Sequence, residues 1–168
     1  PDYLKDSQKL LHNKDLIELD TQHLKSKMGF ETIFSSDWKH YQETFLSIVS
    51  ETCFDNNSIY FSEKTIKPLL HMHPFIMMST PYTLQKLNEL GFKTFDGFID
   101  ESYDREEQTK ARFQMILREI DKFNDKPFEE LKNWWTDILP ILEHNQKRLL
   151  ELGKQKTEKI KLLEKIND

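Results

Sequence analysis

The sequence has 168 residues, a formal net charge of −5, 37% apolar residues and 32% charged residues. This length allows one domain with an appended helical segment, and the 12 Phe, five Tyr and three Trp suffice for a core. The negative charge disfavours nucleic acid as a partner, because Lys and Arg side chains that neutralise phosphates supply most of that affinity. Without any run of ~20 apolar residues, we expect no membrane span.

The cysteine content bears on the compartment. A single cysteine, Cys53, excludes an intramolecular disulfide and indicates a reducing environment, so we expect a cytoplasmic protein. The sequence begins with Pro1, which suggests a processed chain or a piece of a longer one.

The first half of the chain predicts two strands joined by a helix. Before them, apolar residues in positions 1–40 are spaced irregularly and predict a helical or irregular segment, with residues 31–34 as a candidate strand. Residues 44–50 alternate and are rich in β-branched and aromatic side chains, so they predict a strand. Ser62 is positioned to cap a helix over residues 63–71, which Pro68 shortens or kinks. The apolar run at residues 74–78 predicts a buried strand.

A second helix is predicted after this strand. Ser79 or Thr80 is its expected N-cap, Pro81 takes a place in its first turn, and Gly91 ends it. Residues 92–95 then predict a third short strand.

From residue 103 onward the apolar period changes to 3.6, which predicts helices. One precedes Pro127, a second begins there and is kinked or ended by Pro140, and a third runs to about residue 166. This order predicts an α/β fold, a Rossmann-like parallel sheet (βαβαβ) followed by a helical C-terminal region. The expected organisation is an N-terminal segment over 1–40, a Rossmann-like domain over 41–125 and C-terminal helices over 126–168.

The stretch Tyr-Phe-Ser-Glu-Lys at residues 60–64 is the most suggestive of chemistry. Behind the capping Ser62, Glu63 and Lys64 place a carboxylate and an ammonium at a helix N-terminus, beside free backbone N–H groups. The helix dipole and Lys64 favour an anion such as a phosphate, and a Glu can accept hydrogen bonds from a diol such as ribose. The alternative is that Glu63 only complements the dipole and Lys64 is solvated, since many capped helices begin with an acidic residue.

Residues 45–80 resemble the donor-binding half of GT-B glycosyltransferases, fucosyltransferase-like enzymes in particular. Those enzymes carry a strand ending in Glu-Asn, a loop, then Tyr-x-Thr-Glu-Lys opening a helix, then an apolar strand that begins near a Pro. The resemblance implies that Glu63 contacts the nucleotide ribose and Lys64 the diphosphate of a nucleotide-sugar substrate, with no metal and no further cofactor. It implies a donor site formed by Glu51, Tyr60, Ser62, Glu63, Lys64, Ser79 and Thr80.

The chain departs from that pattern at three positions. Thr52 replaces the usual Asn, Ser62 replaces Thr, and Ser79 stands where the family has Gly. Ser for Thr is conservative at a helix cap, and the other two departures leave the identity of the donor open.

A second resemblance covers more of the chain and involves an uncharacterised family met in phages and marine microbes. It is carried by Ser-Glu-Lys-Thr at 62–65, Pro-Phe-Ile at 74–76, Gly-Phe-Lys-Thr-Phe at 91–95 and Asp-Glu-Ser-Tyr-Asp at 100–104. Because that family has no established activity, the resemblance supports the prediction of a folded domain but does not indicate a reaction or a ligand.

Two classes of function follow as expectations. The first is the nucleotide-sugar-binding domain of a glycosyltransferase, an enzyme only when an N-terminal acceptor domain completes it, because residues 1–44 are too few for a second domain of roughly 100 residues. No catalytic residue is assigned. The second is a non-enzymatic protein-interaction module, or a viral structural or accessory module, on the same fold. The C-terminal helices either pack back onto the domain or associate with a partner chain or a second copy.

Three further groups have less specific patterns. Residues 100–107 form the densest acidic cluster of the sequence. Such a cluster could bind a divalent cation or cap helices. Because the acidic residues do not have the spacing of an EF-hand loop, capping is favoured. His71 and His73 have no third His or Cys nearby in the sequence, so a structural role is favoured over metal binding. Cys53 has no activating His beside it and is expected to be a buried or loop thiol.

Overall fold

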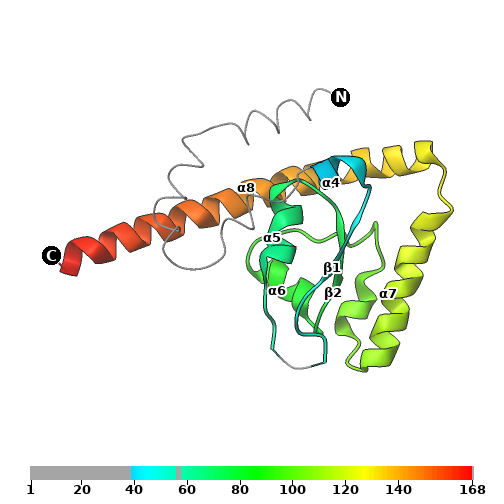
Figure 1. Cartoon of the computed structure of the whole chain (residues 1–168), viewed down its shortest axis with the longest axis horizontal. Coiled ribbons are helices and arrows are strands. Elements are labelled where there is room, and N and C mark those ends of the chain that lie inside the picture. Colours follow the sequence, from blue (N-terminus) through cyan, green and yellow to red (C-terminus); the bar gives the residue numbers. More distant parts are fainter. Residues whose placement is uncertain (1–38, 56–57, 168) are drawn as a thin grey trace. The chain divides into compact units, whose positions relative to one another are not determined.

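A computed structural model describes residues 39–55 and 58–167 (Figure 1). The predicted strand at residues 31–34, and the N-terminal segment apart from its last two residues, lie outside these ranges. Apart from Lys39 and His40, the described residues belong to one compact unit, which begins at Tyr41. In chain order the elements are α4 (Lys39–Glu43), β1 (Ser47–Ser50), α5 (Glu63–Leu70), β2 (Phe75–Met78), α6 (Thr83–Glu89), the 3-10 helix η1 (Glu101–Arg105), α7 (Thr109–Asn124) and α8 (Phe128–Asn167).

The two predicted strands and the helix between them are confirmed as one β1–α5–β2 unit. β1 and β2 pair in parallel, with Ser47 opposite Phe75 and Ser50 opposite Met78. A parallel pair needs a crossover, and α5 provides it. The described residues therefore form a mixed α/β fold with a two-stranded parallel sheet and a long C-terminal helix.

The core surrounds β2. Phe75, Ile76 and Met77 are all almost completely buried, as expected for an apolar strand covered on both faces. Ile116 of α7 and Ile138 of α8 belong to the same buried cluster. Figure 1 shows α5 and α6 on one side of the strand pair and α7 on the other.

The third predicted strand, at residues 92–95, is wrong, so residues 39–55 and 58–167 do not form a complete βαβαβ order. The Asn145 side chain of α8 accepts a hydrogen bond from the Lys93 amide at 2.7 Å and donates one to the Lys93 carbonyl at 2.8 Å. The amide of Phe95 donates to Glu101 Oε1 at 2.7 Å. Because side chains take these backbone groups, they are not available to a strand ladder, and only an isolated bridge between Asp96 and Ile99 forms in this region.

Of the two outcomes predicted at Pro140, a kink or an end of the helix, the end is wrong, because α8 continues through this residue. Pro140 removes one helical hydrogen bond, but Ile138 and Leu142 on either side are buried in the core and hold both halves of the helix against the domain. Within the described residues, no helix is both long and apolar enough to span a membrane.

Side chains of α8 also bind the carboxyl-terminal ends of two shorter helices. Gln146 donates to the Leu70 carbonyl at the end of α5 at 2.7 Å, and Arg148 Nε donates to the Leu90 carbonyl beyond α6 at 2.8 Å. Gly91 follows with a φ of +88°, which confirms it as the residue that ends this helix. These contacts show that the first half of α8 packs back onto the domain.

Arg112 of α7 connects three loops from inside the protein. Its side chain is 1% exposed, and its guanidinium lies 4.5 Å from the centre of the Phe54 ring. It donates to the Ser79 carbonyl at 3.1 Å, to the Glu106 carbonyl at 2.7 Å and to the Glu107 carbonyl at 3.3 Å, and also to the Phe54 carbonyl. The loops after β1 and β2 and the start of α7 are therefore fixed to one side chain.

Replacing Arg112 with Met should lower the free energy of unfolding by about 3–5 kcal/mol, because several carbonyls lose a charged donor and stay buried. Urea denaturation followed by circular dichroism measures this loss. Arg118→Met, at an exposed position of the same helix, is the control and should change stability by less than about 0.5 kcal/mol. Equal losses in the two variants would contradict the role given to Arg112.

Candidate functional site

The candidate site lies at the carboxyl ends of β1 and β2, where open parallel sheets bind ligands. The structure brings the predicted site residues to this end, but at different depths. Glu51, Ser62, Ser79 and Thr80 are buried, Glu63 is half-buried, and Tyr60 and Lys64 are exposed. Only the last three therefore have surface that a ligand can reach directly in this structure.

Glu51 joins the end of β1 to the start of α5. Its amide donates to the Met78 carbonyl at 3.0 Å, which extends the strand pairing by one residue. Its Oε1 accepts hydrogen bonds from the Ser62 amide at 2.9 Å and from Thr65 Oγ1 at 2.5 Å. A carboxylate therefore already occupies the positive end of α5, where it is favoured by the helix dipole.

Ser62 is confirmed as the N-cap of α5. Its Oγ accepts a hydrogen bond from the Lys64 amide at 3.2 Å, and its carbonyl accepts from the Thr65 and Ile66 amides. This cap fixes the backbone so that Glu63 and Lys64 form the first turn of the helix, as the sequence predicts. The cap therefore places Lys64, an exposed residue, in the first turn of α5.

Ser79 and Thr80 act within the turn after β2. The Ser79 hydroxyl donates to the Cys53 carbonyl at 3.4 Å, and the Thr80 hydroxyl contacts the Ser58 carbonyl at 3.5 Å. Thr83 Oγ1 donates to the Thr80 carbonyl at 2.7 Å. These buried hydroxyls hold the two loops together, so the structure assigns them a role in the shape of the site.

The prediction that Ser79 or Thr80 caps α6 is wrong, because the N-cap is Tyr82 and the capping side chain comes from Asp104. Asp104 accepts hydrogen bonds from the Leu84 amide at 2.9 Å and from the Gln85 amide at 3.1 Å. Tyr82 has a φ of +64°, which is rare for a residue with a side chain. Its amide donates to the Asp104 carbonyl at 2.6 Å, which helps to hold this conformation.

The acidic cluster at residues 100–107 is used for capping. Asp100 accepts from the Ser102 amide at 3.0 Å, Glu101 accepts from an amide of the preceding loop, and Asp104 caps α6. Burial raises the pKa of Glu101 to about 7, and burial also raises the pKa of Asp104 although backbone N–H groups oppose it. In the part of the chain that the structure describes, no three His, Cys, Asp or Glu residues are arranged to hold a metal ion.

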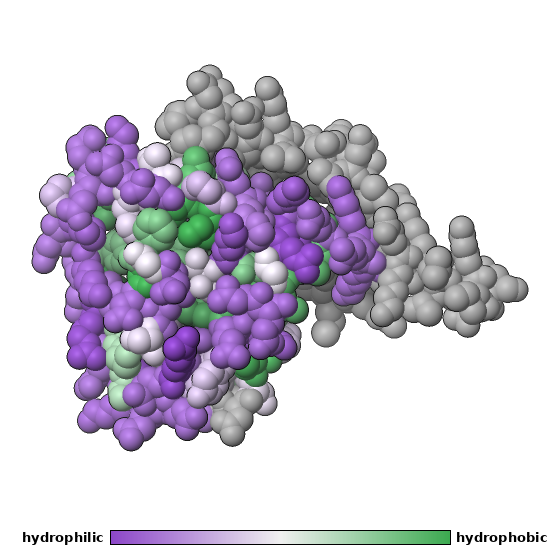
Figure 2. All heavy atoms as spheres, turned by 180° about the vertical axis from the view of Figure 1, so that it is seen from behind, coloured by the Kyte–Doolittle hydropathy of each residue, from purple (hydrophilic) through white to green (hydrophobic). Residues whose placement is uncertain are grey.

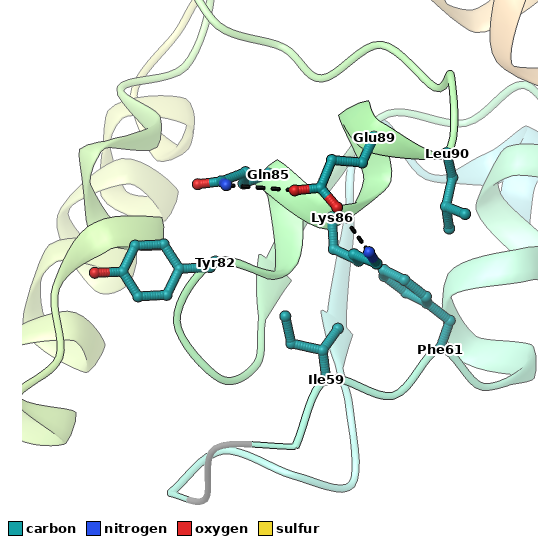
Figure 3. A pocket seen from close by; sticks show the side chains of 7 residues that line it. All are labelled: Ile59, Phe61, Tyr82, Gln85, Lys86, Glu89 and Leu90. Carbon is teal, nitrogen blue, oxygen red and sulfur yellow. Dashed lines mark hydrogen bonds and ion pairs between the residues drawn. The ribbon is translucent and has the colours of Figure 1, made fainter.

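A groove of about 490 Å³ that the sequence did not indicate lies next to the candidate site (Figure 3). It runs between the loop that precedes α5 and the helix α6. Within it, Lys86 pairs with Glu89 at 2.6 Å and Gln85 contacts the same carboxylate at 3.4 Å. The groove is lined by Ile59, Phe61, Tyr82, Gln85, Lys86, Glu89 and Leu90.

His71 and His73 lie toward the amino ends of the strands, away from the candidate site. The Tyr41 ring stacks on His71 with the ring centres 4.6 Å apart. The His73 ring is 2.9 Å from Ser47 Oγ and 3.0 Å from the Thr44 carbonyl. Burial lowers the pKa of His71 to about 4, with further lowering by His73 and then Lys67, and burial also lowers the pKa of His73.

Comparison with known proteins does not identify a family for this chain. Searches against protein-family models, curated proteins and solved structures gave no significant match. The site is therefore interpreted from its own geometry.

Replacing Asp104 with Ala should lower the free energy of unfolding by about 1–2 kcal/mol, because two amides of α6 lose their acceptor. Thermal denaturation measures the change. Glu107→Ala, in the same acidic segment, leaves both amides capped and is the control. A loss as large in Glu107→Ala would show that the capping role is misassigned.

Acidification should destabilise the protein through His71. Since its pKa is about 4 in the folded chain and about 6.5 in the unfolded chain, only the unfolded chain takes up this proton between those values. The contribution of neutral His71 to the free energy of unfolding is therefore fully present above about pH 6.5 and is lost as the pH falls to about 4. In His71→Phe, which keeps an aromatic ring against Tyr41, the loss between pH 7 and 4.5 should be smaller by about 2 kcal/mol. Urea denaturation of both proteins at the two pH values tests this. An equal loss of stability in the natural protein and in His71→Phe would refute it.

Proposed function

We propose that this chain contains the nucleotide-sugar-binding domain of a GT-B-type glycosyltransferase, which transfers a sugar from a nucleotide-diphosphate donor. The observation that carries this proposal is the placement of Lys64. Its ammonium is exposed at the N-terminus of α5, at the carboxyl end of a parallel β1–α5–β2 unit. This is the end of such a unit at which nucleotides bind.

The charges at this end suit a ligand with two kinds of polar group. Lys64, an exposed residue in the first turn of α5, attracts an anion such as a diphosphate. Glu63, half-buried in the same turn, is an acceptor, which suits hydroxyl groups rather than phosphate oxygens. A nucleotide sugar carries both a diphosphate and several hydroxyls, whereas an inorganic phosphate carries no such hydroxyls.

The exposed aromatic ring of Tyr60 supports the same ligand class. It is 58% exposed and precedes the capped turn by two residues. An exposed ring offers a flat apolar surface for a base or a sugar face. In this proposal β1 and β2 are part of a larger Rossmann-like sheet, and catalysis needs an acceptor domain that supplies the catalytic base.

A protein-interaction module is the second candidate, favoured by apolar side chains on the surface. Ile48 on β1 is 51% exposed, although parallel strands are usually covered on both faces. Phe113 and Leu117, one turn apart on α7, are also exposed. Figure 2 shows apolar side chains among the hydrophilic ones on one face of the molecule. In this second candidate these side chains form a contiguous apolar surface, which is typical of contacts with another polypeptide.

Calorimetric titration with GDP, UDP, CDP and their sugar conjugates tests the first candidate. One nucleotide should bind, and Lys64→Ala should weaken it by about 1–3 kcal/mol, the contribution of a hydrogen bond to a charged group. Lys67→Ala is the matched control, because Lys67 lies in the last turn of α5, where the helix dipole disfavours anions. If no member of the panel binds at millimolar concentration, the donor-domain proposal fails and the interaction module replaces it.

A further inference from the structure

Two apolar side chains of α7 lie at the surface, one turn apart. Phe113 is 39% exposed and Leu117 is 41% exposed, whereas Ile116 of the same helix is completely buried. Ile120 continues the exposed side of the helix and is half-buried. These three residues, Phe113, Leu117 and Ile120, form an apolar row beside the one that packs on the core. α7 has 16 residues and is about 24 Å long, so a second helix has room to lie along the row.

β1 extends this apolar surface, because the strand runs alongside α7. Phe45, which precedes β1, has its ring centre 6.1 Å from that of Phe123 near the end of α7. Phe54, which follows β1, has its ring centre 6.3 Å from that of Phe113 near the start of α7. The strand between these two contacts therefore runs antiparallel to α7, and its exposed Ile48 continues the surface.

Charged residues flank the apolar row in a pattern that is complementary to itself. Lys110 and Asp121 are both exposed, and about three turns of α7 separate them. They therefore lie on the same side of the row, with the cation near the start of the helix and the anion near its end. When two identical helices pack antiparallel about a twofold axis, this side of each helix meets the same side of the other. Lys110 of each copy then faces Asp121 of the other copy.

We infer that a second copy of this chain packs on the apolar row, in an antiparallel pair of α7 helices related by a twofold axis. Phe113 of each copy packs against Leu117 of the other, and the axis passes near Met115. The apolar contacts supply most of the affinity, while the exposed Lys–Asp pairs fix the direction of the helices. A second copy is favoured over an unrelated partner because the charges of one α7 match those of another α7. The inference goes beyond the donor-domain proposal and names the partner that the interaction-module candidate leaves open.

Sedimentation equilibrium of the full chain tests this inference by measuring the dissociation constant of a homodimer. The natural protein should form dimers, and Leu117→Ser should raise the dissociation constant about 100-fold, because each dimer loses two apolar side chains from its interface. The melting temperature should barely change, since Leu117 is exposed in the single chain. Leu90→Ser is the matched control, because Leu90 is similarly exposed at the end of α6, on the other side of the strand pair from α7 (Figure 1). It should leave the dissociation constant unchanged.

Charge reversal tests the direction of the helices. Lys110→Glu and Asp121→Lys should each weaken their own homodimer about tenfold, because both ion pairs become pairs of like charge. An equimolar mixture of the two variants should recover the natural affinity, since each charged residue of one variant then meets an opposite charge on the other. This recovery is specific to an antiparallel pair of α7 helices.

Three outcomes would overturn the inference. The natural protein is monomeric at all concentrations up to millimolar, or Leu117→Ser leaves the dimer intact, or mixing the charge variants does not recover the affinity. If Leu117→Ser instead lowers the melting temperature of a monomer by several degrees, another segment of the same chain covers the row, which also overturns the inference. None of the substituted residues belongs to the candidate donor site, so the result is independent of the nucleotide titration.

Discussion

The hydrogen bonds of one buried guanidinium hold the candidate site in place. Arg112 donates to carbonyls in the loop after β1, in the turn after β2 and at the start of α7. Those loops form the end of the parallel sheet at which ligands bind, so the contact that stabilises the interior also fixes the form of the site. The hydrogen bonds of Arg112 to the described residues all go to backbone carbonyls, which keeps the nearby acidic side chains available for other contacts.

Two buried carboxylates hold the helix ends near the candidate site. Glu51 binds the N-terminus of α5, and Asp104 binds the N-terminus of α6. In both cases a side chain far along the sequence satisfies amides that a helix leaves unpaired in its first turn. The consequence for function is that the α5 terminus carries a negative charge inside and a positive charge, Lys64, outside. Of these two charges, only that of Lys64 lies at the surface, so in the proposed function Lys64 is the group that meets the ligand.

The sequence predicted the parts of the fold that depend on local pattern. A strand within residues 44–50, a strand within 74–78, the Ser62 cap and Gly91 as a helix end are each confirmed. The place of Lys64 in the first turn of α5 follows from the cap, whereas its exposure is seen only in the folded chain. The site residues that the sequence missed, Arg112 and Asp104, lie 33 and 20 positions away from their respective partners Ser79 and Leu84. No spacing within a motif connects such residues, so only the folded chain reveals them.

The sequence by itself determined the order of β1, α5 and β2 and the helical character of the C-terminal part, because hydrophobic period, caps and helix-ending residues act over a few positions. The tertiary structure decided which backbone groups pair. Residues 92–95 have the composition of a strand, but Asn145 and Glu101 take their amides and carbonyl, and no ladder forms. Pro140 has the character of a helix break, but the buried residues on either side keep α8 continuous. In both places contacts between distant residues outweighed local preference, because burial in the core and hydrogen bonds to the backbone are stronger than intrinsic propensity.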